Sequence, residues 1–299
     1  MDDRFIRSTH GVTLRLRVRA DPPDAPVTVV FAHATGFCAD VWDPMAADAA
    51  LAGIAEVSLD FRAHGSSTRP PDGDLDWSGT ADDVLAVIDH LAVDQDPSRP
   101  RRFVGAGHSM GGAGLILAEQ RRPGTFAGLW CYEPVVMPPS PERADVGGTA
   151  VDNPLSVVAA RRRADFGSAA EAIAAYSSKP PMSSFRPDAL EAYVRGGFRR
   201  SADGSITLCC RPEDEARLYR MAAQHQAWEA LGSMRCPTVV VRGAMDPPGP
   251  ASFARALVDE MTDARLEVFD HLGHFGPMED PSAMAASLAQ LILAVTAPE

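Results

Sequence analysis

The feature that most constrains the fold is a series of short, continuous apolar runs that alternate with helical segments. The first run, residues 27–34, is rich in valine, and runs of the same character occupy 55–61 and 101–109. Such runs fit parallel strands that are buried on both faces of a sheet. Because residues 81–93 have helical periodicity between the second and third runs, we expect an α/β fold, with a mostly parallel central sheet and helices on both faces.

This rhythm is interrupted between residues 137 and 231, where the apolar runs disappear and prolines cluster. Helical segments such as 189–198 and 215–228 take their place, and the β–α alternation then returns. We therefore expect a core formed by residues 1–136 and 232–299, and a mostly helical insertion formed by residues 137–231.

The composition excludes several classes of partner. The net charge is −12 at pH 7, whereas nucleic-acid binding needs basic patches that contact phosphates. No run of 18 apolar residues and no apolar signal segment is present, so we expect no membrane contact and a cytoplasmic protein. The five cysteines show no C-x-x-C spacing, which predicts neither a zinc site nor disulfides. We expect a monomer or homodimer that acts on a small molecule without a metal or organic cofactor.

The glycine-rich run GAGHSMGGAG, residues 105–114, admits two interpretations. A dinucleotide-binding loop needs G-x-G-x-x-G, and here Met110 occupies the third glycine position. A P-loop needs a lysine followed by serine or threonine, which is absent after the glycines. The same run contains G-x-S-x-G centred on Ser109, between a predicted strand and a predicted helix. This motif places a serine on a sharp turn at the carboxyl edge of the sheet, so we interpret the run as a nucleophile turn.

Residues farther along the chain supply the partners that a serine nucleophile needs. A serine hydroxyl is activated by a base, which is in turn oriented by a carboxylate. Asp246 and His274 each follow a predicted strand, in the order expected for this architecture. Glu133, at the end of another predicted strand, is an alternative acid, and His271 is an alternative base.

The chain resembles the capped α/β-hydrolase family, which includes esterases, meta-cleavage C–C hydrolases, epoxide hydrolases and haloalkane dehalogenases. The insertion lies where that family carries its cap, or lid, domain. Two positions, Ala34 and Ala63, depart from the family pattern, which usually has glycine there. The motifs that carry the resemblance are HATGF (33–37), DFRAHGSS (60–67), GHSMGG (107–112), RGAMDPPGP (242–250) and GHFGPMEDP (273–281).

The resemblance implies a role for each site residue. The nucleophile would be Ser109, the base His274 and the acid Asp246. The two backbone N–H donors of the oxyanion hole would be those of Thr35 and Met110. Phe37 is an alternative oxyanion donor or a pocket residue, and His33 is expected to orient the oxyanion loop. Glu133 is the alternative acid, or it contacts the substrate.

The identity of the nucleophile narrows the expected chemistry. Epoxide hydrolases and haloalkane dehalogenases of the family place an aspartate at this turn, whereas a serine attacks a carbonyl. We therefore expect a serine hydrolase, similar to carboxylic-ester hydrolases, that cleaves an ester or other acyl-type bond of a small, largely apolar molecule. The alternatives are a non-hydrolytic enzyme that uses the same residues, such as an acyltransferase, perhydrolase or cyclising enzyme, and a small-molecule-binding protein with little turnover.

Overall fold

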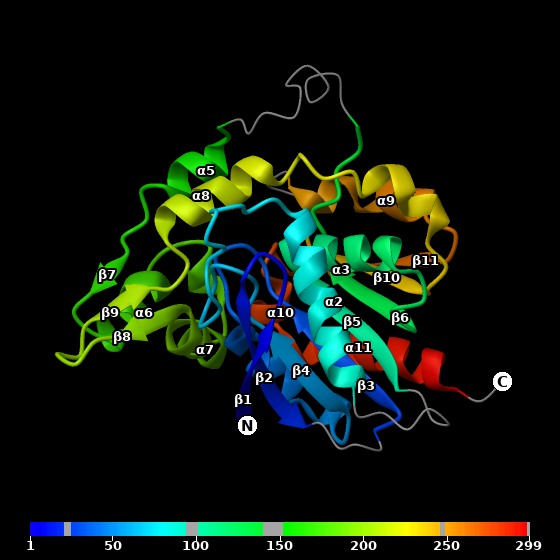
Figure 1. Cartoon of the computed structure of the whole chain (residues 1–299), viewed down its shortest axis with the longest axis horizontal. Coiled ribbons are helices and arrows are strands. Elements are labelled where there is room, and N and C mark those ends of the chain that lie inside the picture. The colour runs from blue at the N-terminus through cyan, green and yellow to red at the C-terminus, as the bar shows by residue number, and fades with distance from the viewer. Residues whose placement is uncertain (21–24, 94–100, 140–151, 246–248, 298–299) are drawn as a thin grey trace.

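An eight-stranded sheet forms the centre of the protein, as seen in a computed structural model that describes residues 1–20, 25–93, 101–139, 152–245 and 249–297 (Figure 1). The strand order is β1-β2-β4-β3-β5-β6-β10-β11. Strands β1, β2 and β4 pair antiparallel, and every pair from β4 to β11 is parallel, which confirms the predicted fold class. The strands are β1 (Asp2–Arg7), β2 (Thr13–Ala20), β3 (Val27–Ala32), β4 (Ala55–Leu59), β5 (Arg102–His108), β6 (Gly128–Tyr132), β10 (Thr238–Arg242) and β11 (Ala264–Val268).

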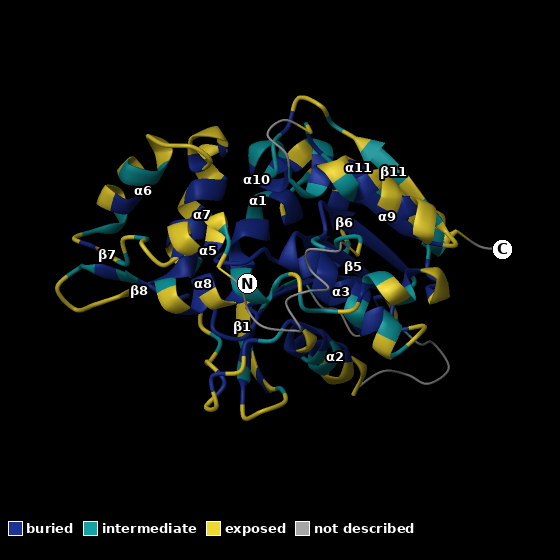
Figure 2. Cartoon of the chain, turned by 90° about the horizontal axis from the view of Figure 1, so that it is seen from above, coloured by how far each residue is buried: buried dark blue, intermediate teal, exposed yellow. Residues whose placement is uncertain are grey.

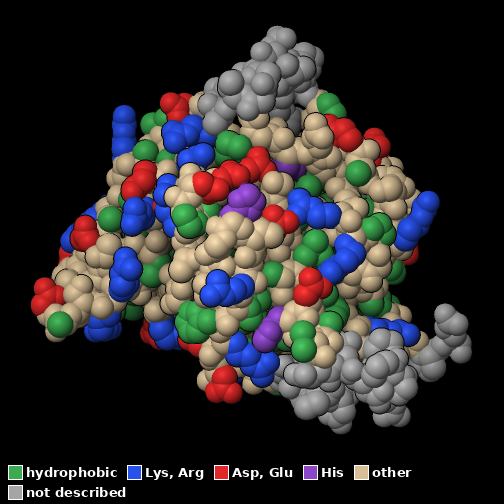
Figure 3. All heavy atoms as spheres, viewed as in Figure 1, with side chains coloured by type: hydrophobic (Ala, Val, Ile, Leu, Met, Phe, Trp, Pro, Cys, Tyr) green, Lys and Arg blue, Asp and Glu red, His purple; other side chains and the backbone are tan. Residues whose placement is uncertain are grey.

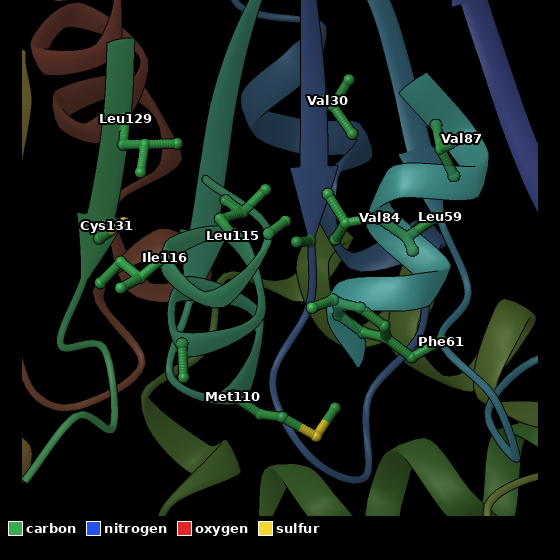
Figure 4. Close-up of a cluster of buried hydrophobic side chains, with 14 of the residues drawn as sticks. Val30, Leu59, Phe61, Val84, Val87, Met110, Leu115, Ile116, Leu129 and Cys131 are labelled. Atoms are coloured by element: carbon green, nitrogen blue, oxygen red, sulfur yellow. The ribbon is translucent and has the colours of Figure 1, made fainter. Parts of the chain in front are cut away.

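Hydrophobic clusters cover both faces of the sheet, which explains why the strands read as continuous apolar runs. Side chains such as Val30 and Leu129 join one cluster with helices α2 (Ser78–Ala92), α3 (Met110–Arg121) and α9 (Ala254–Glu260) (Figure 4). Val29 and Trp130, one position away in the same strands, join the other cluster with α1 (Asp43–Ala46) and α11 (Pro281–Thr296). Figure 2 shows α2 and α11 on opposite sides of the buried strands.

The described residues between β6 and β10 contain four α-helices and a small second sheet. A three-stranded antiparallel sheet, in the order β7-β9-β8, was not expected from the sequence, because strands of two or three residues leave no periodic pattern. Helix α8 ends at Met221, before the end of the predicted segment 215–228. The elements are α5 (Pro154–Ala159), β7 (Asp165–Phe166), α6 (Ala169–Ser177), α7 (Pro187–Gly197), β8 (Phe198–Arg200), β9 (Ile206–Leu208) and α8 (Pro212–Met221).

Polar contacts hold this segment against the core on more than one side. Arg69 forms an ion pair with Asp214 at 2.9 Å. On another side, Arg195 of α7 forms an ion pair with Asp40 at 3.0 Å. Trp77 donates a hydrogen bond from Nε1 to a backbone carbonyl of α8 at 3.0 Å. The position of the insertion relative to the sheet is therefore fixed by side chains that are distant in sequence.

Short helices complete the described structure: η1 (Ala39–Trp42), η2 (Ala49–Leu51), η3 (Met182–Ser184), η4 (Trp228–Ser233), η5 (Pro250–Phe253) and α10 (Gly276–Glu279). No helix in the described part of the chain is long and apolar enough to cross a membrane. On the face shown in Figure 3, basic and acidic side chains are interspersed.

Candidate active site

Ser109 lies on the turn between β5 and α3, with φ of 54° and ψ of −114°, a backbone conformation that non-glycine residues rarely adopt. The turn is tight because its neighbours are glycines. A Cβ on Gly107 would lie 2.6 Å from the amide nitrogen of Gly112, and a Cβ on Gly111 would lie 2.0 Å from the carbonyl oxygen of Ala32. The glycines of G-x-S-x-G are therefore required by close packing.

Ser109 is also fastened to the adjacent strand β6. Its amide donates a hydrogen bond to the carbonyl oxygen of Tyr132 at 3.0 Å, and its carbonyl oxygen accepts one from the amide of Val135 at 3.2 Å. The residue is 8% exposed, and its hydroxyl makes no hydrogen bond to any described residue. Catalytic hydrogen bonds are often absent or long in structures without substrate.

His274 contacts a buried carboxylate near the turn. Its Nδ1 lies 2.6 Å from Oε2 of Glu133, which directly follows β6 and is 1% exposed. A carboxylate only accepts hydrogen bonds, so Nδ1 carries the proton and Nε2 is free to act as a base. The other oxygen of Glu133, Oε1, accepts a hydrogen bond from the amide of Gly243 at 2.8 Å. Glu133 is thus held by the residue that directly follows β10, and it orients the imidazole.

The two alternatives of the sequence analysis have different outcomes. Asp246, the predicted acid, lies outside the described residues, so its role stays a prediction. The carboxylate found beside His274 is that of Glu133, the alternative. His271, the alternative base, is exposed, and its ring contacts Phe269 rather than Glu133.

Three further side chains hold the loop that carries His274, and the sequence analysis did not identify them. His108 lies within hydrogen-bond distance of the carbonyl oxygen of His274, at 2.8 Å from Nε2. The hydroxyl of Tyr132 donates to the carbonyl oxygen of Gly273 at 2.6 Å. The amide of Gly273 donates to Oε2 of Glu279 at 2.6 Å. Of these, His108 and Glu279 fall within motifs that the sequence analysis singled out, GHSMGG and GHFGPMEDP, although neither was given this role there.

The predicted oxyanion donors, Thr35 and Met110, lie next to each other. The hydroxyl of Thr35 donates to the Met110 sulfur at 3.3 Å. Met110 is the first residue of α3, where helix amides have no partner within the helix, and no hydrogen bond from the Thr35 amide reaches a described residue. The amide of Phe37, the alternative donor, is occupied by the carbonyl oxygen of Ala34 at 3.1 Å. Neither predicted amide is therefore occupied within the described part of the chain, and their role as oxyanion donors stays a prediction.

Two buried histidines lie in and beside the predicted oxyanion loop, and the expected role of His33 in orienting that loop stays a prediction. His33 accepts a hydrogen bond from the amide of Phe61 at 3.1 Å, and His64 accepts one from the amide of Gly36 at 3.0 Å. Burial lowers the pKa of His64 to about 4 and lowers the pKa of His33 well below its ordinary value. Both rings are therefore neutral at pH 7. Ala63, one of the departures from the family pattern, has a φ of 63°.

Three aromatic side chains pack together beside His274. The rings of Phe37, Phe185 and Phe275 form a triangle with centroid distances of 6.1, 5.6 and 5.4 Å. Phe37 belongs to the oxyanion loop, Phe275 follows His274, and Phe185 comes from the insertion. This largely buried apolar cluster adjoins the predicted base and the loop of the predicted oxyanion donor Thr35. No group of three or more His, Cys, Asp or Glu side chains that could hold a metal ion is found within the described ranges.

Comparison with known proteins places the chain in a family. The family model described as "Alpha/beta hydrolase family" matches residues 29–287. The chain therefore belongs to the α/β-hydrolase family, which supports its assignment as a hydrolase. No curated protein matches the sequence.

Solved structures share the fold at low sequence identity. An E-2-(acetamidomethylene)succinate hydrolase is 18% identical, with a TM-score of 0.75 over 97% of this chain and 99% of its own. The peroxisomal α/β-hydrolase Lpx1 of Saccharomyces cerevisiae is 18% identical, with a TM-score of 0.76 over 100% and 90%. A thermophilic esterase from Thermogutta terrifontis is 19% identical, with a TM-score of 0.70 over 99% and 100%.

Proposed function

We propose that this protein is a serine hydrolase in which Ser109 is the nucleophile, His274 the general base and Glu133 the carboxylate that orients it. The observation that carries the proposal is the 2.6 Å hydrogen bond between His274 Nδ1 and Glu133 Oε2, beside a strained turn that presents a serine. Both partners lie at the carboxyl ends of strands in the parallel part of the sheet, where open α/β sheets bind their ligands.

The reaction then follows from the roles of these groups. Ser109 Oγ forms a bond to the substrate carbonyl carbon while His274 Nε2 takes its proton. The amides of Thr35 and Met110 stabilise the negative charge on the carbonyl oxygen, a contribution of about 3 kcal/mol per donor in measured cases. His274 returns the proton to the leaving group. A water molecule, deprotonated by the same nitrogen, then releases the acid and regenerates the serine.

We infer that the substrate is a small, largely apolar molecule with an ester or related acyl bond. The aromatic triangle of Phe37, Phe185 and Phe275 supports an apolar substrate, because it adjoins the predicted base and the oxyanion loop. The compared structures are consistent with acyl chemistry, since one of them is an esterase.

Ser109→Ala tests this function directly. The wild-type protein should hydrolyse short p-nitrophenyl esters and react with a fluorophosphonate probe, and the variant should do neither. Mass spectrometry of the labelled protein should locate the probe on Ser109. Ser252→Ala is a matched control, because Ser252 lies in η5, outside the proposed site. Unchanged ester turnover in Ser109→Ala would contradict the proposed mechanism.

A further inference from the structure

A partly buried arginine joins four elements of the insertion. Arg162, in the turn after α5, donates from Nη1 to Oε2 of Glu215 in α8 at 2.5 Å. Its Nη2 donates to the hydroxyl of Tyr193 in α7 at 2.6 Å and to that of Tyr176 in α6 at 3.2 Å. The side chains of Arg162 and Glu215 are only 16% and 5% exposed. The ion pair is therefore largely withdrawn from water.

This ion pair lies directly against the oxyanion loop. A Cβ on Gly36 would lie 2.5 Å from Oε1 of Glu215 and 3.2 Å from Nη1 of Arg162. Because a carbon–carbon bond is about 1.5 Å long, the carboxylate oxygen lies within about 4 Å of the Gly36 backbone. Gly36 follows Thr35, whose amide is a proposed oxyanion donor. A formal negative charge is thus held next to the loop where the reaction develops a second one.

The local charge balance has a consequence for the rate. A carboxylate near the substrate carbonyl oxygen would repel the oxyanion of the transition state, and burial strengthens this repulsion. The guanidinium of Arg162 cancels that charge because it contacts the carboxylate of Glu215. The hydroxyls of Tyr176 and Tyr193 hold the guanidinium in place from the other side.

We propose that Arg162 is a positioning residue of the oxyanion site, which neutralises Glu215 against the oxyanion loop so that the loop can stabilise negative charge. This role rests on the proposed serine-hydrolase function. It gives the insertion a part in transition-state stabilisation as well as in shaping the substrate pocket.

A charge-swap series tests the role. Burial raises the pKa of Glu215, so the variants are assayed at alkaline pH, where its carboxylate stays ionised. Arg162→Gln should then lower kcat/KM for a p-nitrophenyl ester about tenfold or more, because the charge of Glu215 is no longer cancelled. Adding Glu215→Gln to that variant should restore kcat/KM to within about threefold of wild type. Arg162→Lys keeps the positive charge and should retain most of the rate. Arg163→Gln is the matched control, since Arg163 is the next residue and pairs with Glu171 at the exposed surface.

A second readout separates electrostatics from folding. A trifluoromethyl ketone accepts the Ser109 oxygen at its carbonyl carbon, and the adduct carries the oxyanion. Arg162→Gln should weaken its inhibition more than it raises KM, whereas a merely structural role would alter both alike. The thermal midpoint of each variant is measured in parallel.

The outcomes distinguish this role from the proposed function. If the double variant is no faster than Arg162→Gln, or if Arg162→Lys is as slow, the charge-balancing role is overturned while Ser109 labelling stands. If the wild-type protein is not labelled at Ser109, the proposed function fails, and the role of Arg162 fails with it.

Discussion

Replacing Glu133 by glutamine tests which carboxylate orients His274. In the wild type, Oε1 of Glu133 accepts a hydrogen bond from the Gly243 amide and Oε2 accepts one from His274 Nδ1. In the variant, the backbone N–H of Gly243 still donates its hydrogen bond to the side-chain oxygen of the glutamine. The side-chain NH₂ group of the glutamine therefore faces His274. An NH₂ group only donates hydrogen bonds. His274 Nδ1 must then accept, and the ring proton moves to Nε2, the atom that has to receive the proton of Ser109.

The size of the effect follows from the burial of this pair. The opposite amide orientation would place NH₂ against the Gly243 N–H at a site that is 1% exposed, at a cost of about 1–3 kcal/mol for the unsatisfied donor. The inactive tautomer therefore dominates. We expect kcat to fall roughly 10³- to 10⁴-fold, about 4–5.5 kcal/mol in activation free energy. KM should change little, because the glutamine retains the shape of the glutamate.

The assay is steady-state hydrolysis of a short p-nitrophenyl ester by Glu133→Gln and, in parallel, by Asp246→Asn. Asp246→Asn should lose less than about tenfold in kcat, because the carboxylate that contacts His274 is still present. Circular dichroism checks that both variants are folded. A large loss in Asp246→Asn together with near-normal turnover in Glu133→Gln would refute the assignment of Glu133 and return the role to Asp246.

Three further predictions address stability, pH and specificity. Gly111→Ala should lower the free energy of unfolding, measured in urea, by several kcal/mol, because its Cβ would lie 2.0 Å from a backbone oxygen. Gly249→Ala is the control and should be nearly neutral, because no described atom lies near its Cβ. Similar losses in both variants would contradict the packing argument. Burial lowers the pKa of His64 from 6.5 to about 4, so between these values the unfolded chain binds more protons, and the stability falls as the pH drops, by up to about 3 kcal/mol. Urea titrations of His64→Gln at pH 7 and pH 5 should show a smaller loss than wild type, and an equal loss would exclude this residue as a source. Phe185→Ala should raise kcat/KM for p-nitrophenyl esters of longer acyl chains relative to short ones, because it removes one ring of the triangle. Phe166 lies elsewhere in the insertion, so Phe166→Ala should leave this chain-length preference unchanged. An unaltered preference in both variants would argue against an apolar acyl pocket at the triangle.

Much of the core was predictable because its signals are local. Strands buried on both faces require continuous apolar runs, and helices covering them require a period of 3.6 residues. The turn at Ser109 was predictable for a similar reason, since the steric need for Gly107 and Gly111 is recorded in the sequence itself. The short strands β7, β8 and β9 had no such signal.

The choice of acid could not be settled from the sequence. Asp246 and Glu133 both follow strands and both lie between Ser109 and His274 in the chain, so order and position fit either residue. Two tertiary contacts favour Glu133: its carboxylate contacts His274 directly, and it accepts a hydrogen bond from the backbone amide of Gly243. The supporting roles of His108, Tyr132 and Glu279 likewise depend on contacts between residues far apart in sequence, which a single sequence does not record.

The pairing of β5 with β6 has a consequence for how such a protein can diversify. The serine turn and Glu133 follow neighbouring strands that are hydrogen-bonded to each other, with His108 opposite Tyr132 in the register. If Glu133 is the acid, the distance between nucleophile and acid is set by one strand pair and by the interlocked backbones of Ser109 and Val135. The connection that follows Gly243 after β10 then does not need to orient the base. Substitutions and insertions there would then leave the proton-transfer geometry unchanged.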